Sequence, residues 1–133
     1  MQAALLSAKL PHVGAWTQER RRVAAAYDAQ LNGVGDLQLP RVRAGATHVY
    51  HLYVVQTGSR DRLKSYLAER GIETAVHYPT ALPLLPAYAY LRATPGQYPR
   101  AAANQSRILS LPIYPEMTDE MIEYVVKAIR SFF

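Results

Sequence analysis

The chain has 133 residues, of which 50% are hydrophobic, 19% are charged and none is cysteine. This length and composition fit one globular domain, and the absence of cysteine excludes disulfides, thiol catalysis and thiolate metal sites. No apolar run approaches the ~18 residues of a membrane span, so we expect a cytoplasmic protein with no membrane partner. The net charge of +5 favours polyanions in general, but its sharpest cluster, Arg20–Arg22, is most simply explained as a solvated helix face.

The first predicted element is a long helix over residues 2–32, which would link to the rest of a single domain spanning residues 1–133. Pro11 cannot donate a hydrogen bond to the preceding turn, so the helix should be kinked there. After Pro11, apolar and aromatic residues recur at steps of three and four, which predicts one buried stripe. The pair Asn32–Gly33 then ends the helix. The stripe consists of Val13, Trp16, Val23, Tyr27 and Leu31.

Residues 48–133 predict a small α/β domain. Residues 48–57 alternate between two faces that are both mostly apolar or aromatic, which is typical of a central strand covered on both sides. A helix follows this strand, and residues 73–77 and 108–111 predict two more strands. Thr118 is expected to cap the last helix.

The order of these elements predicts an α+β fold of two layers. We expect a small, mostly antiparallel sheet of three or four strands, with helices on one face and the long helix preceding it. The residues expected to be largely buried are Trp16, Tyr27, Leu31, Leu52, Val54, Leu63, Leu67, Leu111, Ile122, Val125 and Ile129.

Histidines are the first candidates for chemistry in a chain without cysteine. The four histidines are His12, His48, His51 and His77, and no pair has the i, i+4 spacing of a helical zinc site. His48 and His51 are three residues apart on a predicted strand, so they should point to opposite faces. We therefore expect no metal site.

The three lysines are Lys9, Lys64 and Lys127, and each falls on an amphipathic helix. We expect all three to face solvent, whereas a lysine that forms a Schiff base needs a desolvated pocket. The sequence also contains no glycine-rich phosphate loop of either common kind. No catalytic residue is therefore assigned from these patterns.

His77 lies at the end of the predicted strand over residues 73–77, directly before Tyr78 and Pro79. Side chains at such a strand end commonly project into a cleft, and a histidine there can donate or accept a hydrogen bond near neutral pH. The residues alone leave two interpretations open. His77 is either functional or simply bonds a nearby backbone carbonyl.

Several separate motifs resemble sugar aminotransferases of the DegT/StrS type. The run Gly71–Pro79, which reads GIETAVHYP, shows the likeness most clearly, and the other matches follow in the same order along essentially the whole chain. The resemblance is specific because many separate motifs agree. The other matches are Gln2–Ala4, Lys9–Leu10, Trp16, Arg21, Tyr27, Leu31, His51–Tyr53, Arg60–Leu63, Pro86–Tyr88, Leu109–Pro115 and the helix start at Thr118.

The resemblance implies the small C-terminal domain of a fold type I enzyme that depends on pyridoxal phosphate. Members of this family move an amino group, usually from glutamate, to a keto group of a nucleotide-linked sugar. By the same resemblance, His77 and Tyr78 would line the sugar side of the active site, and His51 would join them in binding substrate. The Schiff-base lysine and most cofactor ligands would lie in a large domain upstream of Met1, so no cofactor-binding residue is assigned.

Two stretches depart from the family pattern. Ala81–Leu85 stands where many members have Pro-Leu-His-Leu-Gln, and Ala102 stands where a glutamate is frequent. The contacts that the missing histidine would make are therefore not assigned to this chain.

These observations lead us to expect a truncated or free-standing C-terminal domain that does not transaminate alone. Its expected partners are a second copy, as a dimer, or a large aminotransferase domain. The alternative is a non-catalytic binding or assembly module that self-associates through residues 3–10 and 79–90 or partners a complete aminotransferase. Nucleic acid is not an expected partner, because Arg20–Arg22 lacks interleaved aromatic residues and any recognisable binding motif.

Overall fold

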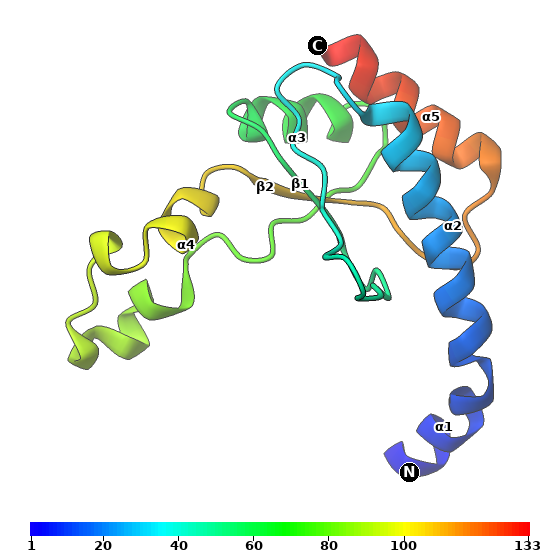
Figure 1. Ribbon diagram of the computed structural model, residues 1–133, viewed down its shortest axis with the longest axis horizontal. Helices are drawn as coiled ribbons and strands as arrows, with labels where there is room; N and C mark the ends of the chain where they lie inside the picture. Colours follow the sequence, from blue (N-terminus) through cyan, green and yellow to red (C-terminus); the bar gives the residue numbers. More distant parts are fainter.

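A two-stranded antiparallel sheet lies at the centre of the computed structural model, which describes residues 1–133 (Figure 1). Strand β1 (Tyr53–Gln56) pairs with strand β2 (Ile108–Leu111). Residues directly opposite each other in an antiparallel pair share one face of the sheet. The register therefore gathers four buried side chains on one apolar face, namely Tyr53, Val55, Leu109 and Leu111.

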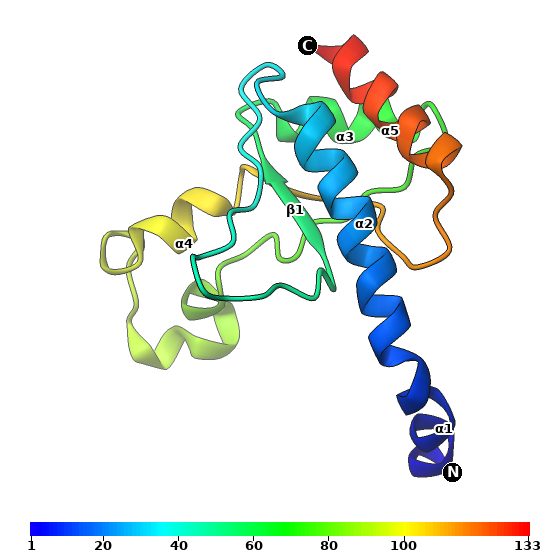
Figure 2. The ribbon, with the colours of Figure 1, turned by 45° about the vertical axis from the view of Figure 1, so that its right-hand side comes forward.

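Helices α2, α3 and α5 pack on this apolar face of the sheet (Figure 2). The cap expected at the start of α5 is confirmed, because the Thr118 hydroxyl accepts a hydrogen bond from the Met121 backbone N–H. No helix combines the length and the apolar composition needed to cross a membrane. The helices are α1 (Gln2–Lys9), α2 (Val13–Leu31), α3 (Arg60–Ala68), α4 (Pro99–Asn104) and α5 (Asp119–Phe132), and 3₁₀ turns span Leu10–His12, Leu82–Leu84, Pro86–Leu91 and Pro95–Gln97.

Two tyrosines at the centre of the core join α2 to the sheet. Tyr27 and Tyr53 are fully buried, and their ring centroids lie 5.1 Å apart. A buried hydroxyl without a partner is costly, and each of these hydroxyls donates a hydrogen bond, Tyr27 to the Pro112 carbonyl oxygen at 2.9 Å and Tyr53 to the Asp28 carboxylate. Burial raises the pKa of both tyrosines well above the ordinary value, so the hydroxyls remain protonated donors.

Most of the expected core is confirmed. Trp16, Leu52 and Val54 are the exceptions, because they are only half-buried. Trp16 lies on the part of α2 that extends beyond the sheet (Figure 1). Val54 alternates with Tyr53 along β1, so its side chain is on the face opposite the helices, and the expectation of a strand covered on both sides is wrong. The confirmed core residues are Tyr27, Leu31, Leu63, Leu67, Leu111, Ile122, Val125 and Ile129.

The long N-terminal helix is interrupted at Pro11. Helix α1 ends at Lys9, a 3₁₀ turn over Leu10–His12 contains the proline, and α2 begins at Val13. No residue of α1 is buried, and the first buried side chain along the chain is Val23. Two of the five residues of the predicted stripe, Val13 and Trp16, therefore lie outside the core.

The antiparallel sheet with helices on one face is confirmed, but it has two strands where three or four were expected. The two further segments lie beside the sheet and touch it through single bridges. Gln38 bridges to Gln56 at one edge, and Ala75 bridges to Ser110 at the other. The predicted strand over residues 73–77 is therefore an extended segment held at one residue.

The predicted strand over residues 48–57 begins only at Tyr53 because the backbone turns just before it. Tyr50 has φ 48°, in the left-handed region that an extended strand cannot contain. The backbone N–H of Tyr50 donates to Nδ1 of His48 at 2.9 Å, which stabilises this turn. The alternating pattern of the sequence did not reveal it.

Residues 79–105 form an arm that projects from the sheet on the side away from α2 (Figure 1). The arm contains no buried residue, and Leu82, Tyr90 and Leu91 are 63%, 75% and 56% exposed. Its two ends are tied together by Gln105, whose side-chain oxygen accepts a hydrogen bond from the Ala81 N–H at 2.7 Å. The arm therefore has internal order without a core of its own.

Asp36 joins the loop after α2 to the turn between β1 and α3. Its carboxylate accepts hydrogen bonds from the hydroxyl of buried Thr57 and from the Gly58 N–H at 2.7 Å. The same hydroxyl accepts from the Ser59 N–H at 3.0 Å, at the start of α3. The hydrogen bond from Thr57, followed by that from Gly58, lowers the pKa of Asp36 below its ordinary value.

We predict that Leu63→Ala and Ile122→Ala each lower the free energy of unfolding by ~2–5 kcal/mol. Both side chains are at most 1% exposed, so truncation removes apolar contacts and leaves a cavity. Urea denaturation measures the change, and Val49→Ala, at a side chain that is 55% exposed, is the matched control. Losses of only a few tenths of a kcal/mol at both core positions would contradict the packing described here.

We predict that Asp36→Asn destabilises the fold at neutral pH and that the difference from wild type disappears in acid. A group with a lowered pKa in the folded state stabilises the fold above its ordinary pKa of about 3.9, and loses that contribution as the pH falls through the folded value. Urea midpoints between pH 7 and pH 2 test this. Exposed Glu116→Gln is the control, and a pH-independent difference would refute the expectation.

Candidate functional site

His77 is held against the sheet by Ser110 of β2. The backbones of Ala75 and Ser110 exchange two hydrogen bonds, at 2.8 and 3.2 Å, which place the segment before His77 alongside β2. Two residues further on, Nδ1 of His77 lies 2.9 Å from Oγ of Ser110. Since Ser110 is only 4% exposed, the histidine bonds a buried hydroxyl, and the expected alternative of a bond to a backbone carbonyl is not what the structure shows.

A cavity of about 260 Å³ opens beside this contact. Its walls come from the turn before β1, the extended segment around Ala75, the end of β2 and the loop that follows β2. Small-molecule sites usually measure about 300–1,000 Å³, so this cavity has room for part of a ligand such as one sugar ring. We call it the histidine cavity, and its lining residues are His51, Leu52, Glu73, Thr74, Ala75, His77, Ser110, Leu111, Pro112 and Ile113.

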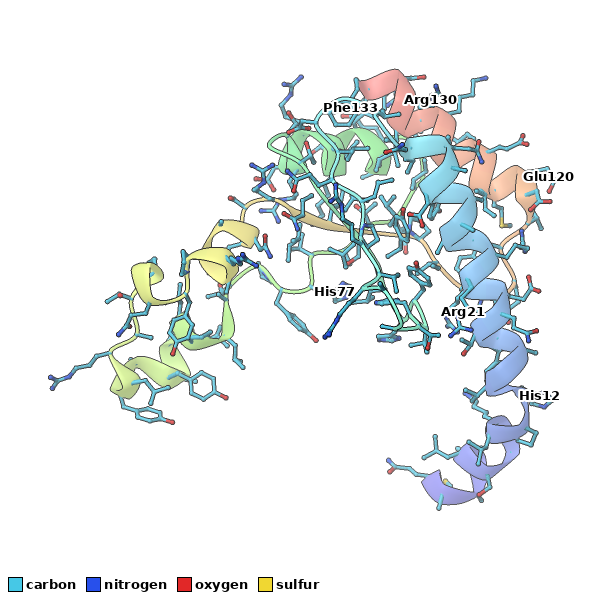
Figure 3. All side chains as sticks on the ribbon, viewed as in Figure 1. His12, Arg21, His77, Glu120, Arg130 and Phe133 are labelled. Atoms are coloured by element: carbon cyan, nitrogen blue, oxygen red, sulfur yellow. The ribbon has the colours of Figure 1, made fainter.

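The structure brings together two of the three residues predicted to bind substrate. His51 and His77 are 26 positions apart in the sequence, yet both line the histidine cavity. Tyr78 lies outside it, is 73% exposed and packs edge-on to His77, with ring centroids 5.7 Å apart. Figure 3 shows His77 between the arm and the long helix, on the side from which α1 and the arm extend.

The other two histidines have local roles. Nδ1 of His48 accepts the Tyr50 N–H, and the His12 ring packs on Trp16 with centroids 5.5 Å apart. Nowhere do three histidine, aspartate or glutamate side chains gather closely enough to hold a metal ion. His51 and His77 are therefore the histidines that remain as candidates for binding a ligand.

The lysines lie apart from the histidine cavity. Lys9, Lys64 and Lys127 are exposed on helices α1, α3 and α5, and none of them lines the cavity. The cavity therefore contains hydrogen-bonding imidazoles, a serine and one carboxylate, Glu73, but no amine that could attack a carbonyl.

The arginine cluster on α2 has partners within the chain. Nε of Arg21 donates to the His48 carbonyl oxygen at 2.8 Å, and Arg22 bonds the carboxylates of Glu19 and Asp119. Arg22 also donates to the Met117 carbonyl oxygen at 2.6 Å, which ties α2 to the start of α5. Two of the three arginines are therefore engaged in holding the fold.

A larger and more apolar cavity, of about 610 Å³, lies beside the histidine cavity. It is bounded by the first turns of α5, the turn after α3 and the loop before α5, and it shares only Glu73 and Pro112 with the histidine cavity. Met117, Met121 and Tyr124 are among its lining residues, and it contains neither histidine nor lysine. Its size exceeds that of the histidine cavity, but it offers fewer groups for chemistry.

Ser110 is the site residue that the sequence did not identify. It interrupts an otherwise apolar strand between Leu109 and Leu111. A buried polar residue at such a position needs a hydrogen-bond partner, which is a signal that could have marked it. The partner itself, 33 positions away in the sequence, could only be found from the fold.

Comparison with known proteins places this architecture among sugar aminotransferases. A "Pleiotropic regulatory protein" of Geobacillus stearothermophilus is 44% identical over 135 residues, and the alignment covers 100% of this chain and 36% of that protein. A dTDP-3-amino-3,4,6-trideoxy-alpha-D-glucose transaminase of Streptomyces venezuelae is 39% identical and is matched over 99% of this chain and 35% of its own length. The chain thus spans about a third of the length of these relatives.

The fold agrees with the sequence comparison. The crystal structure of S. venezuelae DesV in complex with a ketimine intermediate superposes with a TM-score of 0.94 at 39% identity, covering 99% of this chain and 36% of DesV. The family model for DegT/DnrJ/EryC1/StrS aminotransferases matches residues 1–130, which include both histidines of the cavity and Ser110. From its first helix to its last, the chain therefore belongs to the DegT/DnrJ/EryC1/StrS aminotransferase family.

Proposed function

We propose that this chain is the C-terminal small domain of a nucleotide-sugar aminotransferase that depends on pyridoxal phosphate. In this proposal His51 and His77 bind the sugar part of the substrate, and Tyr78 flanks it from the exposed side of His77. The observation that supports it most directly is that His51 and His77, from separate segments of a chain with this family relationship, line one cavity. A relative that is named as a dTDP-amino-sugar transaminase supports the substrate class.

The residues of this chain do not fit pyridoxal phosphate by themselves. The cofactor is held in aminotransferases as a Schiff base of lysine, and all three lysines here are exposed on helices outside the histidine cavity. The cavity also contains no arginine or lysine to balance the charge of a phosphate. In our proposal the amine chemistry therefore comes from protein outside residues 1–133, and this chain contributes substrate contacts.

We predict that purified chain mixed with pyridoxal phosphate shows no internal-aldimine absorbance band that borohydride fixes to one lysine. Each lysine amine is in solvent, so its reaction with the aldehyde should be weak and spread over all three. Mass spectrometry after reduction reads out the sites, and Lys64→Arg and Lys127→Arg are the controls for surface labelling. A stoichiometric adduct at a single lysine, together with amino transfer from glutamate, would refute this part of the proposal.

The second candidate function is a non-catalytic assembly module, which the exposed apolar surface favours. Helix α1 buries none of its residues, and Leu5, Leu6 and Leu10 are 60%, 67% and 71% exposed. On the arm, Leu82 is 63% exposed, whereas Leu84 and Leu85 are half-buried. Contiguous apolar patches larger than a few hundred Å² are rare on soluble monomers and usually mark contacts. The name of the G. stearothermophilus relative, a regulatory protein, also fits this candidate.

We predict that the chain forms a dimer at micromolar concentration through α1 and that Leu5→Ser with Leu6→Ser shifts it towards monomer. In a twofold dimer the same patch is buried on both subunits. The two substitutions therefore place four polar side chains in one interface. Sedimentation velocity measures the shift, and Val42→Ser, at an exposed side chain outside α1 and the arm, is the matched control. A wild-type chain that stays monomeric and binds no hydrophobic dye would rule out self-association.

A further inference from the structure

We propose that Ser110 is a positioning residue, which holds neutral His77 with a proton on Nε2 and directs that N–H into the histidine cavity. The group of the ligand that meets His77 is then a hydrogen-bond acceptor, such as a keto or hydroxyl oxygen of the sugar. The nature of the ligand rests on the proposed function, whereas the role of Ser110 rests on the geometry of this chain alone.

The position of the Ser110 hydroxyl is set by two neighbouring segments. Ser110 lies opposite Val54 in the β1–β2 pair, and its own N–H and carbonyl both bond Ala75 on the other side. With its backbone paired on the Ala75 side and its side chain on His77, Ser110 contacts the same segment three times. The backbone of Ser110 therefore cannot move away from the segment that contains His77 without breaking the edge of the sheet.

The direction of the Ser110–His77 hydrogen bond follows from what else the hydroxyl contacts. A serine hydroxyl has one proton to donate and two lone pairs to accept with. Oγ of Ser110 has one hydrogen-bond partner, Nδ1 of His77, and is buried. If Oγ accepted a proton from Nδ1, its own O–H would be buried without an acceptor, which costs about 1–3 kcal/mol. The hydroxyl therefore donates to Nδ1, and neutral His77 carries its proton on Nε2.

The second nitrogen of His77 is then free to act on a ligand. Nε2 makes no hydrogen bond within the chain, and the His77 side chain lines the histidine cavity. As a donor, Nε2–H favours an oxygen that accepts, and it does not favour an ammonium or another N–H group. Ser110 lines the cavity as well, but it is only 4% exposed and its hydroxyl is taken up by Nδ1 of His77, so its main action on a ligand is through His77.

Nitrogen-15 NMR of the histidine rings in the 133-residue chain tests this assignment. Wild-type His77 at a pH where it is neutral should show a protonated Nε2 and an unprotonated, hydrogen-bonded Nδ1. In Ser110→Ala the Nδ1 signal should move to the value of a free nitrogen, and ring relaxation should show greater mobility. Ser110→Thr keeps a hydroxyl and should restore the wild-type signals. Ser106→Ala, at an exposed hydroxyl just after the arm, is the matched control and should change nothing at His77.

Titration with dTDP-glucose supplies the second readout. The Nε2–H signal of His77 should shift on binding, and Ser110→Ala should weaken affinity three- to tenfold, about 0.6–1.4 kcal/mol, as expected for loss of one well-placed hydrogen bond. A proton on Nδ1 in the wild-type chain, or a His77 ring that Ser110→Ala leaves unchanged, would overturn the role of Ser110. If the ring responds to Ser110→Ala but dTDP-glucose leaves it unperturbed, the Ser110 assignment is upheld and the proposed substrate role fails.

Discussion

The pairing of β1 with β2 is the constraint on which the rest of this structure depends. Because side chains alternate across a strand, the register that turns Leu109 and Leu111 towards the helices also turns Ser110 to the opposite face. The same short strand thus contributes two leucines to the core and the serine that bonds His77. A shift of one residue in this register would bury the serine hydroxyl among apolar side chains and expose two leucines.

The two faces of the sheet consequently differ in what they contact. On one side, α2, α3 and α5 close a continuous core around Tyr27 and Tyr53. On the other side, the sheet is only partly covered, and the histidine cavity forms where the segment around Ala75 leaves β2. The Tyr27 hydroxyl connects the two, because it bonds the carbonyl of Pro112, a residue of the cavity wall. Core packing therefore helps to hold the site in shape.

Much of the apolar surface outside the core is shared between α1 and the arm (Figure 1). Neither packs on the central sheet, although their sequences contain leucines at helical spacing or in proline-rich turns. Under our proposal, such surfaces are contact regions for further protein, either a second copy or a larger domain. This view gives α1 a role that the core of this chain does not explain.

The sequence alone determined the features that depend on local chemistry and on periodicity. Apolar spacing predicted the helices, and single residues predicted the break at Pro11 and the cap at Thr118. Short runs of consecutive residues indicated the family. The sequence also identified His51 and His77, the two histidines of the cavity.

Only the tertiary structure decided what depends on contacts between distant segments. It limited the sheet to two strands, because Tyr50 turns the backbone and the segment at Ala75 meets β2 at a single residue. It joined His77 to Ser110 and left Tyr78 outside the cavity. Periodicity shows which face of an element is apolar, but not whether another element covers that face. For that reason the stripe around Trp16 was expected in the core and is half-buried instead.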